Sequence, residues 1–478
     1  MVAYRDLREW IQEFDKMGEL RYAEGVDWNL ELGAISDVSL HKFGSPAIIF
    51  QKIKGYEEGG RVLVNPSGSP RRAGLLLGIP GTESKTQLAQ EWRKKVRDLR
   101  LIPPKTVATG PIKENVFQGD EVDLFKLPVP FWHKLDGGRY LGTGCVVITR
   151  DPDDGWVNLG TYRGMVHDKS SMSLYMDPGR HGRIHRNKYF QRNKPFPVAM
   201  VFGCDLSIYI FSQISMAPYG VSEYDYAGGL RGEPVEVIIG EYTGLPIPAS
   251  AEIVIEGECL PNDMKEEGPF GEWTGYYASG AREEPVIRVK TLMHRNDPII
   301  HGSPPVRPPS NINYLRAIIK SASMWDAIEK AGVPDVKGVW CHEVGGTWLF
   351  HVISIKQRYP GHAKQAALIA SQCQEGVSLG RFTITVDDDI DPANLEEVVW
   401  AMCTRCDPER SIDIIRRCLS SPLDPVFNKN DPAFNALNSR AIIEACKPFE
   451  WIEDFPQMVG IDPEEKNEIE KKWERLFK

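Results

Sequence analysis

The stretch AEIVIEGECLPNDMKEEGPFGEWTGYY, residues 251–277, decides how the middle of this chain is built. It starts as an apolar, β-branched run typical of a buried strand and ends in a turn containing Gly and Pro. Helical periodicity is sparse around it, so we predict a mostly β barrel or sandwich rather than βαβ units. Further short β-like runs, separated by Gly, Pro, Asp and Asn, lie at 143–150, 156–167, 171–177, 197–203, 234–240 and 285–293.

The regions on either side of this β-rich middle have other patterns. Residues 4–18 carry apolar side chains at helical spacing, which predicts an amphipathic helix, and the Pro-rich residues 99–116 read as a crossing linker. Beyond residue 310, helices alternate with strands, which indicates an α/β layer. The predicted fold class is therefore α/β (α+β), with divisions at 1–118, 119–305, 306–440 and 441–478.

The last division combines a Pro-rich segment of low periodicity, 422–456, with a charged terminal helix. A narrow apolar stripe runs along that helix and cannot form a core on its own. We expect this arm to dock on a partner subunit through Ile469, Trp473, Leu476 and Phe477.

Length and composition limit the classes of protein to consider. The 478 residues are 42% hydrophobic and 26% charged, which is ordinary for about three globular domains. The net charge of −9 provides no basic field for polyphosphate, so nucleic acid is not an expected partner. The start, MVAYRDLREW, has no apolar leader, and no run of about 18 apolar residues occurs. We therefore expect a cytoplasmic protein without a membrane partner.

The nine cysteines are scattered, odd in number and mostly embedded in apolar runs, as buried reduced thiols are. Cys403 and Cys406 form one C-x-x-C, but they follow a helical pattern and lack a second pair at zinc-finger spacing. No Walker A motif, G-x-S-x-G, H-E-x-x-H or strand-bound G-x-G-x-x-G appears. The acidic run 386–392 lacks the glycine and glutamate of an EF-hand and suits a strand-to-helix turn.

Two carboxylates, Glu267 and Glu272, bracket a Gly-Pro-Phe-Gly turn that can bring them together. Paired carboxylates push each other's pKa values apart, and a nearby arginine can hold one ionised while the other stays protonated as a general acid. The alternative is a solvated acidic hairpin, because turns are polar in most proteins.

If 156–167 is one strand, Arg163 shares a face with Leu159 and Thr161, where its charge needs a partner. The alternatives are an arginine that reaches solvent and one that forms a purely structural ion pair. Three other polar residues stay ambiguous, because no local spacing rule links them: Asn158, His181 and Glu223.

Seven ordered blocks covering nearly the whole chain resemble the UbiD-like family of reversible decarboxylases. They are NLGTYR (158–163), HGRIH (181–185), APYGVSEYDYAGGLRGEPVEV (217–237), PASAEIVIEGE (248–258), EGPFGEWTGYY (267–277), RYPGHAKQ (358–365) and DDDIDPANLEEVVWAMCTRCDPER (387–410). The resemblance implies an N-terminal α/β domain, a central split β-barrel that binds prenylated FMN, and a C-terminal α/β domain with a terminal helical arm.

The same resemblance implies the residues of the site. The family's catalytic arginine and two acids fall on Arg163, Glu267 and Glu272, with Glu272 as the proton donor. Its ligands for Mn²⁺ or Mg²⁺ fall on Asn158, His181 and Glu223. A potassium ion (K⁺) binds backbone carbonyls near residues 212–215, and the further cofactor contacts are Thr161, Tyr162, Arg180, Met216 and Pro218. Leu159 and Arg180 depart from some members, which have Trp and Gln there.

The resemblance also implies a reaction and its partners. The segment 421–428, SPLDPVFN, is similar to the catalytic subunits of phenolic-acid decarboxylases, which favours a small aromatic or heteroaromatic acid that exchanges CO₂. A flavin prenyltransferase would supply the cofactor, and a homodimer or homohexamer is expected. The alternatives are an α,β-unsaturated or polyprenyl acid as substrate, a noncatalytic flavin-binding homologue, and a metal-dependent hydrolase using His181 and Glu223.

Overall fold

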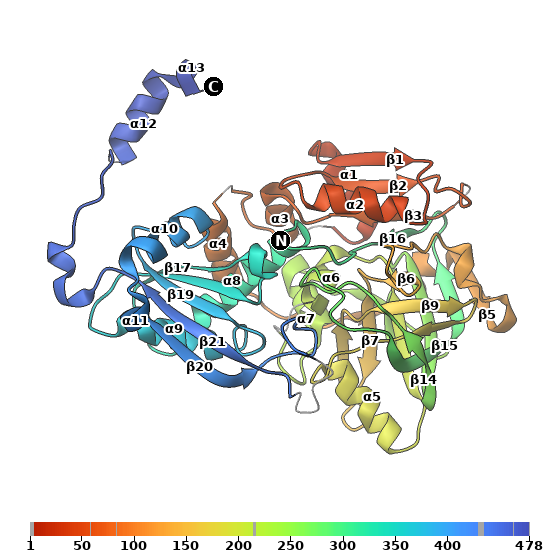
Figure 1. Ribbon diagram of the computed structural model, residues 1–478. Coiled ribbons are helices and arrows are strands. Elements are labelled where there is room, and N and C mark those ends of the chain that lie inside the picture. The colour runs from red at the N-terminus through yellow and green to blue at the C-terminus, as the bar shows by residue number, and fades with distance from the viewer. Residues whose placement is uncertain are drawn as a thin grey trace.

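The computed structural model describes residues 4–57, 59–82, 84–213, 217–428, 435–461 and 463–477. Figure 1 shows an N-terminal layer in red, a β-rich body in yellow and green, and an α/β unit in blue, followed by an arm. Within the described ranges the strands form sheets of four, nine, three and five strands. The predicted α/β (α+β) class and its order of parts are confirmed.

The N-terminal layer begins with α1 (Leu7–Lys16), which confirms the helix predicted at 4–18. Asp6 caps this helix by accepting a hydrogen bond from the Glu9 amide, and the apolar face buries Trp10 and Phe14. The layer's sheet contains β1 (Leu20–Glu24), β2 (Ala47–Gln51), β3 (Arg61–Val64) and β16 (Ile299–His301), and its other helices are α2 (Glu31–Leu40) and α3 (Pro70–Leu77). The next helix, α4 (Lys85–Arg97), packs against the C-terminal unit (Figure 1).

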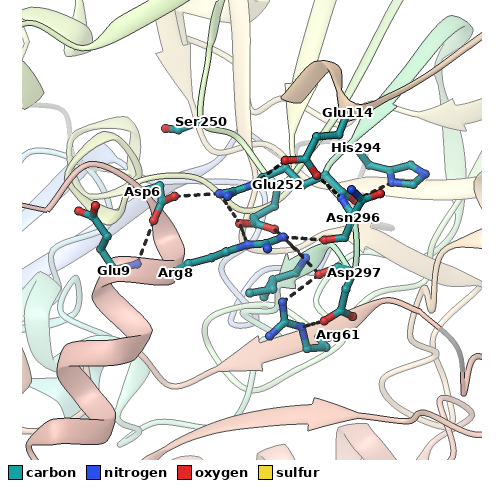
Figure 2. Close-up of polar contacts among 12 residues, drawn as sticks. Asp6, Arg8, Glu9, Arg61, Glu114, Ser250, Glu252, His294, Asn296 and Asp297 are labelled. Carbon is teal, nitrogen blue, oxygen red and sulfur yellow. Dashed lines mark hydrogen bonds and ion pairs between the residues drawn. The ribbon is translucent and has the colours of Figure 1, made fainter. Parts of the chain in front are cut away.

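A buried ion cluster connects α1 to the central body (Figure 2). The Glu252 side chain has no exposed surface and accepts two hydrogen bonds of 2.9 Å from Arg8. Arg295 donates to both Glu252, at 3.2 Å, and Asp6, at 2.8 Å. Because a buried carboxylate needs such donors, this cluster holds the first helix against the strand that follows Glu252.

The central body is a nine-stranded antiparallel sheet in the order β6-β9-β10-β15-β14-β11-β7-β8, with β5 paired to β15. Its longest hairpin joins β14 (Ile253–Glu267) to β15 (Arg282–His294), and therefore includes the stretch 251–277. The other strands are β5 (Asn115–Gln118), β6 (Arg139–Gly142), β7 (Val146–Arg150), β8 (Val157–Gly160), β9 (Gly164–Asp168), β10 (Ser171–Ser173) and β11 (Phe196–Val201). A small sheet beside it contains β4 (Lys105–Thr106), β12 (Glu236–Ile239) and β13 (Pro246–Pro248).

Three helices of this body did not stand out in the sequence: α5 (His181–Gln191), α6 (Leu206–Gln213) and α7 (Glu223–Arg231). Nearly every side chain of α6 is buried, so it has no polar face and no amphipathic period. Helix α7 contains two adjacent glycines, which lower helix propensity. Tertiary packing therefore stabilises helices that local patterns did not indicate.

The single strand predicted at 156–167 is wrong, because the chain breaks after Gly160 into β8 and β9. β8 pairs with β7, whereas β9 pairs with β6 and β10. The reason lies in the packing of Tyr162, whose ring a Cβ on Gly160 would approach within 2.4 Å. Since Gly160 leaves room for that ring, residues 161 and 162 belong to neither strand, and Arg163 forms an isolated bridge with Tyr175.

The C-terminal unit contains a five-stranded sheet flanked by helices, which confirms the predicted α/β layer. The acidic run forms the predicted strand-to-helix turn, where Arg405 binds Asp387 at 2.8 Å and Asp389 at 2.7 Å. The strands in sheet order are β17 (Val336–Cys341), β18 (Phe350–Ile355), β19 (Phe382–Asp387), β21 (Leu437–Ala445) and β20 (Ile412–Leu419). The helices are α8 (Ile312–Lys330), α9 (His362–Gln372), α10 (Leu395–Arg405) and α11 (Pro408–Ser411).

Strand β21 falls inside the segment 422–456, in which the sequence indicated no regular element. It also spans residue 440, at which we placed the end of the third division. Beyond it, α12 (Pro463–Lys472) and α13 (Glu474–Phe477) extend away from the body in Figure 1. Trp473 and Leu476 are exposed, and the side chain of Phe477 lies outside the described part of the structure. Docking of this arm on a partner stays a prediction.

The short 3-10 helices are η1 (Pro111–Glu114), η2 (Gly119–Glu121), η3 (Leu124–Lys126), η4 (Glu343–Gly345) and η5 (Phe449–Asp454).

No described helix is both long enough and apolar enough to cross a membrane. All nine cysteines are free thiols, and most are buried, as the sequence indicated. Cys403 is exposed at the end of α10, and Cys406 follows that helix.

Candidate active site

Arg163 holds the two carboxylates that the sequence singled out. Its Nε and Nη2 donate to Glu267 at 2.7 and 2.9 Å, and its Nη1 donates to Glu272 at 2.7 Å. Glu267 ends β14, Glu272 lies in the turn before β15, and Arg163 precedes β9. The three side chains therefore meet at one end of the long hairpin, as a fork-shaped guanidinium permits.

Aromatic rings enclose this arginine–carboxylate cluster. The Tyr140 hydroxyl donates to Glu267 at 2.9 Å, and its ring stacks on Phe270 with centroids 3.8 Å apart. The Arg163 guanidinium lies 4.7 Å from the centroid of Tyr175. Glu267 is fully buried and Glu272 is 7% exposed. The alternative of a solvated acidic hairpin is therefore wrong for these two side chains.

Burial sets the protonation of the cluster. It raises the pKa of Glu272 above its ordinary value, with Arg163 acting in the opposite direction. Burial would lower the pKa of Arg163, but Glu272 and Glu267 raise it, so the guanidinium stays charged. Ser279 also donates to Glu272 at 3.1 Å. A buried carboxyl that keeps its proton to higher pH, beside a fixed cation, has the properties of a general acid.

A second cluster brings together Asn158, His181 and Glu223, which the sequence left unlinked. Asn158 is on β8, while His181 and Glu223 are the first residues of α5 and α7. Asn158 Oδ1 lies 3.3 Å from His181 Nδ1, and the amide of Leu159 donates to Glu223 at 2.7 Å. Two helix starts and one strand therefore converge on a single point of the barrel.

The electrostatics of this second cluster suit a cation. Burial raises the pKa of Glu223 to about 8, and no cationic side chain of the described chain acts to lower it. Burial also lowers the pKa of His181, which keeps the imidazole neutral and able to bind a metal. The buried Asn158 Nδ2 makes no hydrogen bond within the described structure. Amide oxygen, imidazole and carboxylate together form a donor set that fits Mn²⁺ or Mg²⁺.

In the described ranges, no group of three or more His, Cys, Asp or Glu side chains lies at metal-binding distances. The predicted metal ligands include only two residues of these types, His181 and Glu223, because the third ligand is Asn158. The residues present therefore fit a divalent metal without forming a cluster of those four residue types.

An aromatic wall that sequence reasoning missed supports the metal-type cluster. The Trp156 ring lies 4.9 Å from His181 and 4.5 Å from Tyr219, measured between centroids. The Tyr219 hydroxyl donates to Asp151 at 3.0 Å. The sequence held one indication of this wall, because Trp156 lies two residues before the predicted ligand Asn158.

The segment 161–163, between β8 and β9, connects the two clusters along the chain. The Tyr162 hydroxyl accepts a hydrogen bond from the Gly182 amide at 3.2 Å, beside His181. The Thr161 amide donates to the Ser212 carbonyl at 3.1 Å. Of the other predicted cofactor contacts, Arg180 caps α5 and Pro218 begins the turn before α7. Met216 lies outside the described residues.

Comparison with known protein families matches almost the whole chain to one of them. Models of the N-terminal, Rift-related and C-terminal domains of 3-octaprenyl-4-hydroxybenzoate carboxy-lyase match residues 11–92, 105–308 and 313–445. The chain belongs to the UbiD family and is a carboxy-lyase of that family. The predicted family and enzyme class are confirmed.

Individual relatives extend over the same length. The chain is 32% identical to a phenolic acid decarboxylase of Bacillus subtilis, covering 94% of this chain and 93% of the relative. It is also 32% identical to a pyrrole-2-carboxylic acid decarboxylase of Pseudomonas aeruginosa, covering 93% and 91%.

Two solved structures have the same multi-domain fold. Vanillic acid decarboxylase of Sedimentibacter hydroxybenzoicus, in a closed form, has a TM-score of 0.84 at 30% identity, with 100% of this chain and 99% of that chain covered. The UbiD-class enzyme HmfF of Pelotomaculum thermopropionicum, in complex with FMN, has a TM-score of 0.83 at 28% identity, with 96% and 98% covered.

Proposed function

We propose that this protein catalyses the reversible, non-oxidative decarboxylation of a small aromatic or heteroaromatic carboxylic acid. The reaction would use prenylated FMN and a divalent metal, with Glu272 as the proton donor. The observation that carries the proposal is the buried Glu272, whose pKa is raised although it accepts a hydrogen bond from Arg163. Loss of CO₂ leaves a carbon that must receive a proton, and a protonated carboxyl held in place can deliver it.

Each residue of the acid cluster has a distinct task in this proposal. Arg163 keeps one negative charge, on Glu267, through two hydrogen bonds, which leaves Glu272 free to carry a proton. Tyr140 fixes Glu267 through its hydroxyl and shields it from water. Ser279 orients the Glu272 carboxyl from the start of the returning chain. The buried, aromatic surroundings keep competing water away from the proton transfer.

The cofactor assignment rests on the relatives and on the metal-type cluster. HmfF is known in complex with FMN, and an evolved dimeric form of it with prFMN. When bound, the prenylated flavin would supply an electron sink for the electron pair that stays on the substrate carbon as CO₂ leaves. Asn158, His181 and Glu223 would hold Mn²⁺ or Mg²⁺, which can neutralise a phosphate in a protein without a basic patch. A potassium ion would bind carbonyls near Ser212.

The substrate class rests on relatives that act on aromatic and heteroaromatic acids, as their names state. An α,β-unsaturated or polyprenyl acid is the alternative substrate, and a noncatalytic flavin-binding homologue is the alternative role. The enclosed Arg163, Glu267 and Glu272 set argues against the noncatalytic role, because buried charges cost stability that a storage protein has no use for. We further propose a cytoplasmic homodimer or homohexamer that receives its flavin from a prenyltransferase.

The test is to produce the protein together with a flavin prenyltransferase and to measure CO₂ released from a panel of acids. The panel contains benzoic, hydroxybenzoic, pyrrole-2-carboxylic, cinnamic and polyprenylated acids. Release from the aromatic or heteroaromatic members, with a flavin absorbance band, is expected. Release confined to the cinnamic or polyprenylated acids would replace the substrate class, and flavin binding without any release would favour the noncatalytic role.

A further inference from the structure

Helix α8 carries a buried lysine that pairs with no carboxylate. Lys320 is 4% exposed, and its ammonium has no hydrogen-bond partner in the described chain. The contact it makes is with the face of Trp348, whose ring centroid is 3.1 Å from Nζ. Burial lowers the pKa of Lys320 to about 7, and Arg316, one turn earlier on the same helix, acts in the same direction. A buried amine that makes no hydrogen bond destabilises a fold in either protonation state, so its retention needs an explanation beyond packing.

Two other polar side chains near Trp348 in the sequence are buried without a hydrogen-bond partner in the described chain. His351, on β18, is fully buried, and neither ring nitrogen has a hydrogen-bond partner of good geometry. Burial, Lys320 and Arg440 lower the pKa of His351 to about 3, so the imidazole is neutral and can both donate and accept. The Thr347 hydroxyl is also buried without a partner. We call Lys320, His351 and Thr347 the polar cluster of the C-terminal unit.

Two contacts connect the surroundings of Lys320 to the elements that carry the active-site residues. Trp348, beneath Lys320, lies 6.3 Å from Trp273, and Trp273 directly follows Glu272 in the hairpin turn. On the other side, Arg316 donates to Gln213 at 3.3 Å, next to the Ser212 carbonyl that binds Thr161. Lys320 is one helical turn from Arg316, on a helix that contacts Gln213 of α6 and packs against β17 of the C-terminal sheet.

We propose that Lys320, with His351, is a specificity-determining contact that binds an oxygen substituent on the ring of the substrate, away from the carboxyl group that is lost. The inference rests on the proposed function, because it concerns the same substrate. The oxygen belongs to a ring hydroxyl or to a second carboxylate. An ammonium donates to either group, and a neutral imidazole can also accept from a hydroxyl. Acids without such an oxygen leave these buried groups unpaired and bind more weakly.

The test compares wild type with Lys320→Met on matched acids: benzoic, 4-hydroxybenzoic and benzene-1,4-dicarboxylic acid. Dissociation constants by calorimetry and KM by CO₂ release are both measured. The variant should weaken the oxygen-substituted acids about 10- to 100-fold, as loss of a charged hydrogen bond does, with benzoic acid changed less than about twofold. Lys330→Met is the control, because Lys330 is an exposed residue at the end of the same helix.

The melting temperature separates this role from a structural one. Removing an unpaired buried charge should leave Tm of Lys320→Met unchanged or higher, whereas a structural lysine would lower it. Whether the wild type binds 4-hydroxybenzoic acid or benzene-1,4-dicarboxylic acid more tightly identifies the oxygen group that Lys320 binds. Equal weakening of all three acids, or no preference in the wild type, would overturn the proposal. Discriminating binding without CO₂ release would support the contact and refute the proposed decarboxylation.

Discussion

Replacing Glu272 by glutamine removes the proposed proton and little else. The glutamine carbonyl can still accept the hydrogen bonds that Arg163 and Ser279 donate at 2.7 and 3.1 Å. Arg163 keeps Glu267 as its counter-charge, so the fold and the cofactor sites should persist. A positioned acid is worth about 10² to 10⁴ in rate, or roughly 3 to 5 kcal/mol of transition-state stabilisation. We expect kcat to fall by that factor while flavin and metal contents stay at wild-type levels.

The assay follows CO₂ release and, separately, exchange of the product's ring hydrogen with D₂O. Both should collapse together, because both use the proton on Glu272. In the wild type, kcat should hold at low pH and fall as the pH rises through the raised pKa of Glu272, because only the protonated acid can donate. Glu266→Gln is the matched control, since Glu266 is the exposed residue beside Glu267. Wild-type exchange in Glu272→Gln would refute the assignment and make Glu267 the next candidate.

Three further predictions concern the metal-type cluster, the arm and the first helix. His181→Ala should remove one of three ligands and lower both Mn²⁺ and flavin content, measured by elemental analysis and absorbance; full occupancy would contradict the ligand assignment. Truncation after Ile461 should shift the assembly to smaller species, because it removes the exposed stripe of the arm, and an unchanged mass by light scattering would count against docking. Arg8→Ala should lower the free energy of unfolding by about 3 kcal/mol, since buried Glu252 loses two hydrogen bonds. Arg5→Ala, which removes an exposed ion pair, should cost less than about 1 kcal/mol, and equal effects in denaturant titrations would disprove the argument.

Local patterns predicted the elements that have one clear apolar face or an apolar run between turn residues. Helix α1 has one apolar face and was found, and the short strands of the body were found because turn residues separate them. Helix α6 was missed because it is buried on all sides, and β21 was missed because it lies in a segment of low periodicity. The break after Gly160 could not be foreseen either, because it depends on where the Tyr162 ring packs.

Residue identities were enough to indicate the family, the order of the three parts and the side chains that carry the chemistry. The chemistry itself depends on how close these side chains lie in space. Arg163 contacts Glu267 and Glu272, which are 104 and 109 residues away from it in the sequence. No local rule connects such positions, because they come together only when the long hairpin folds back on the sheet. Burial then raises the pKa of Glu272 and leaves Lys320 without a partner, and burial is a property of the packed fold.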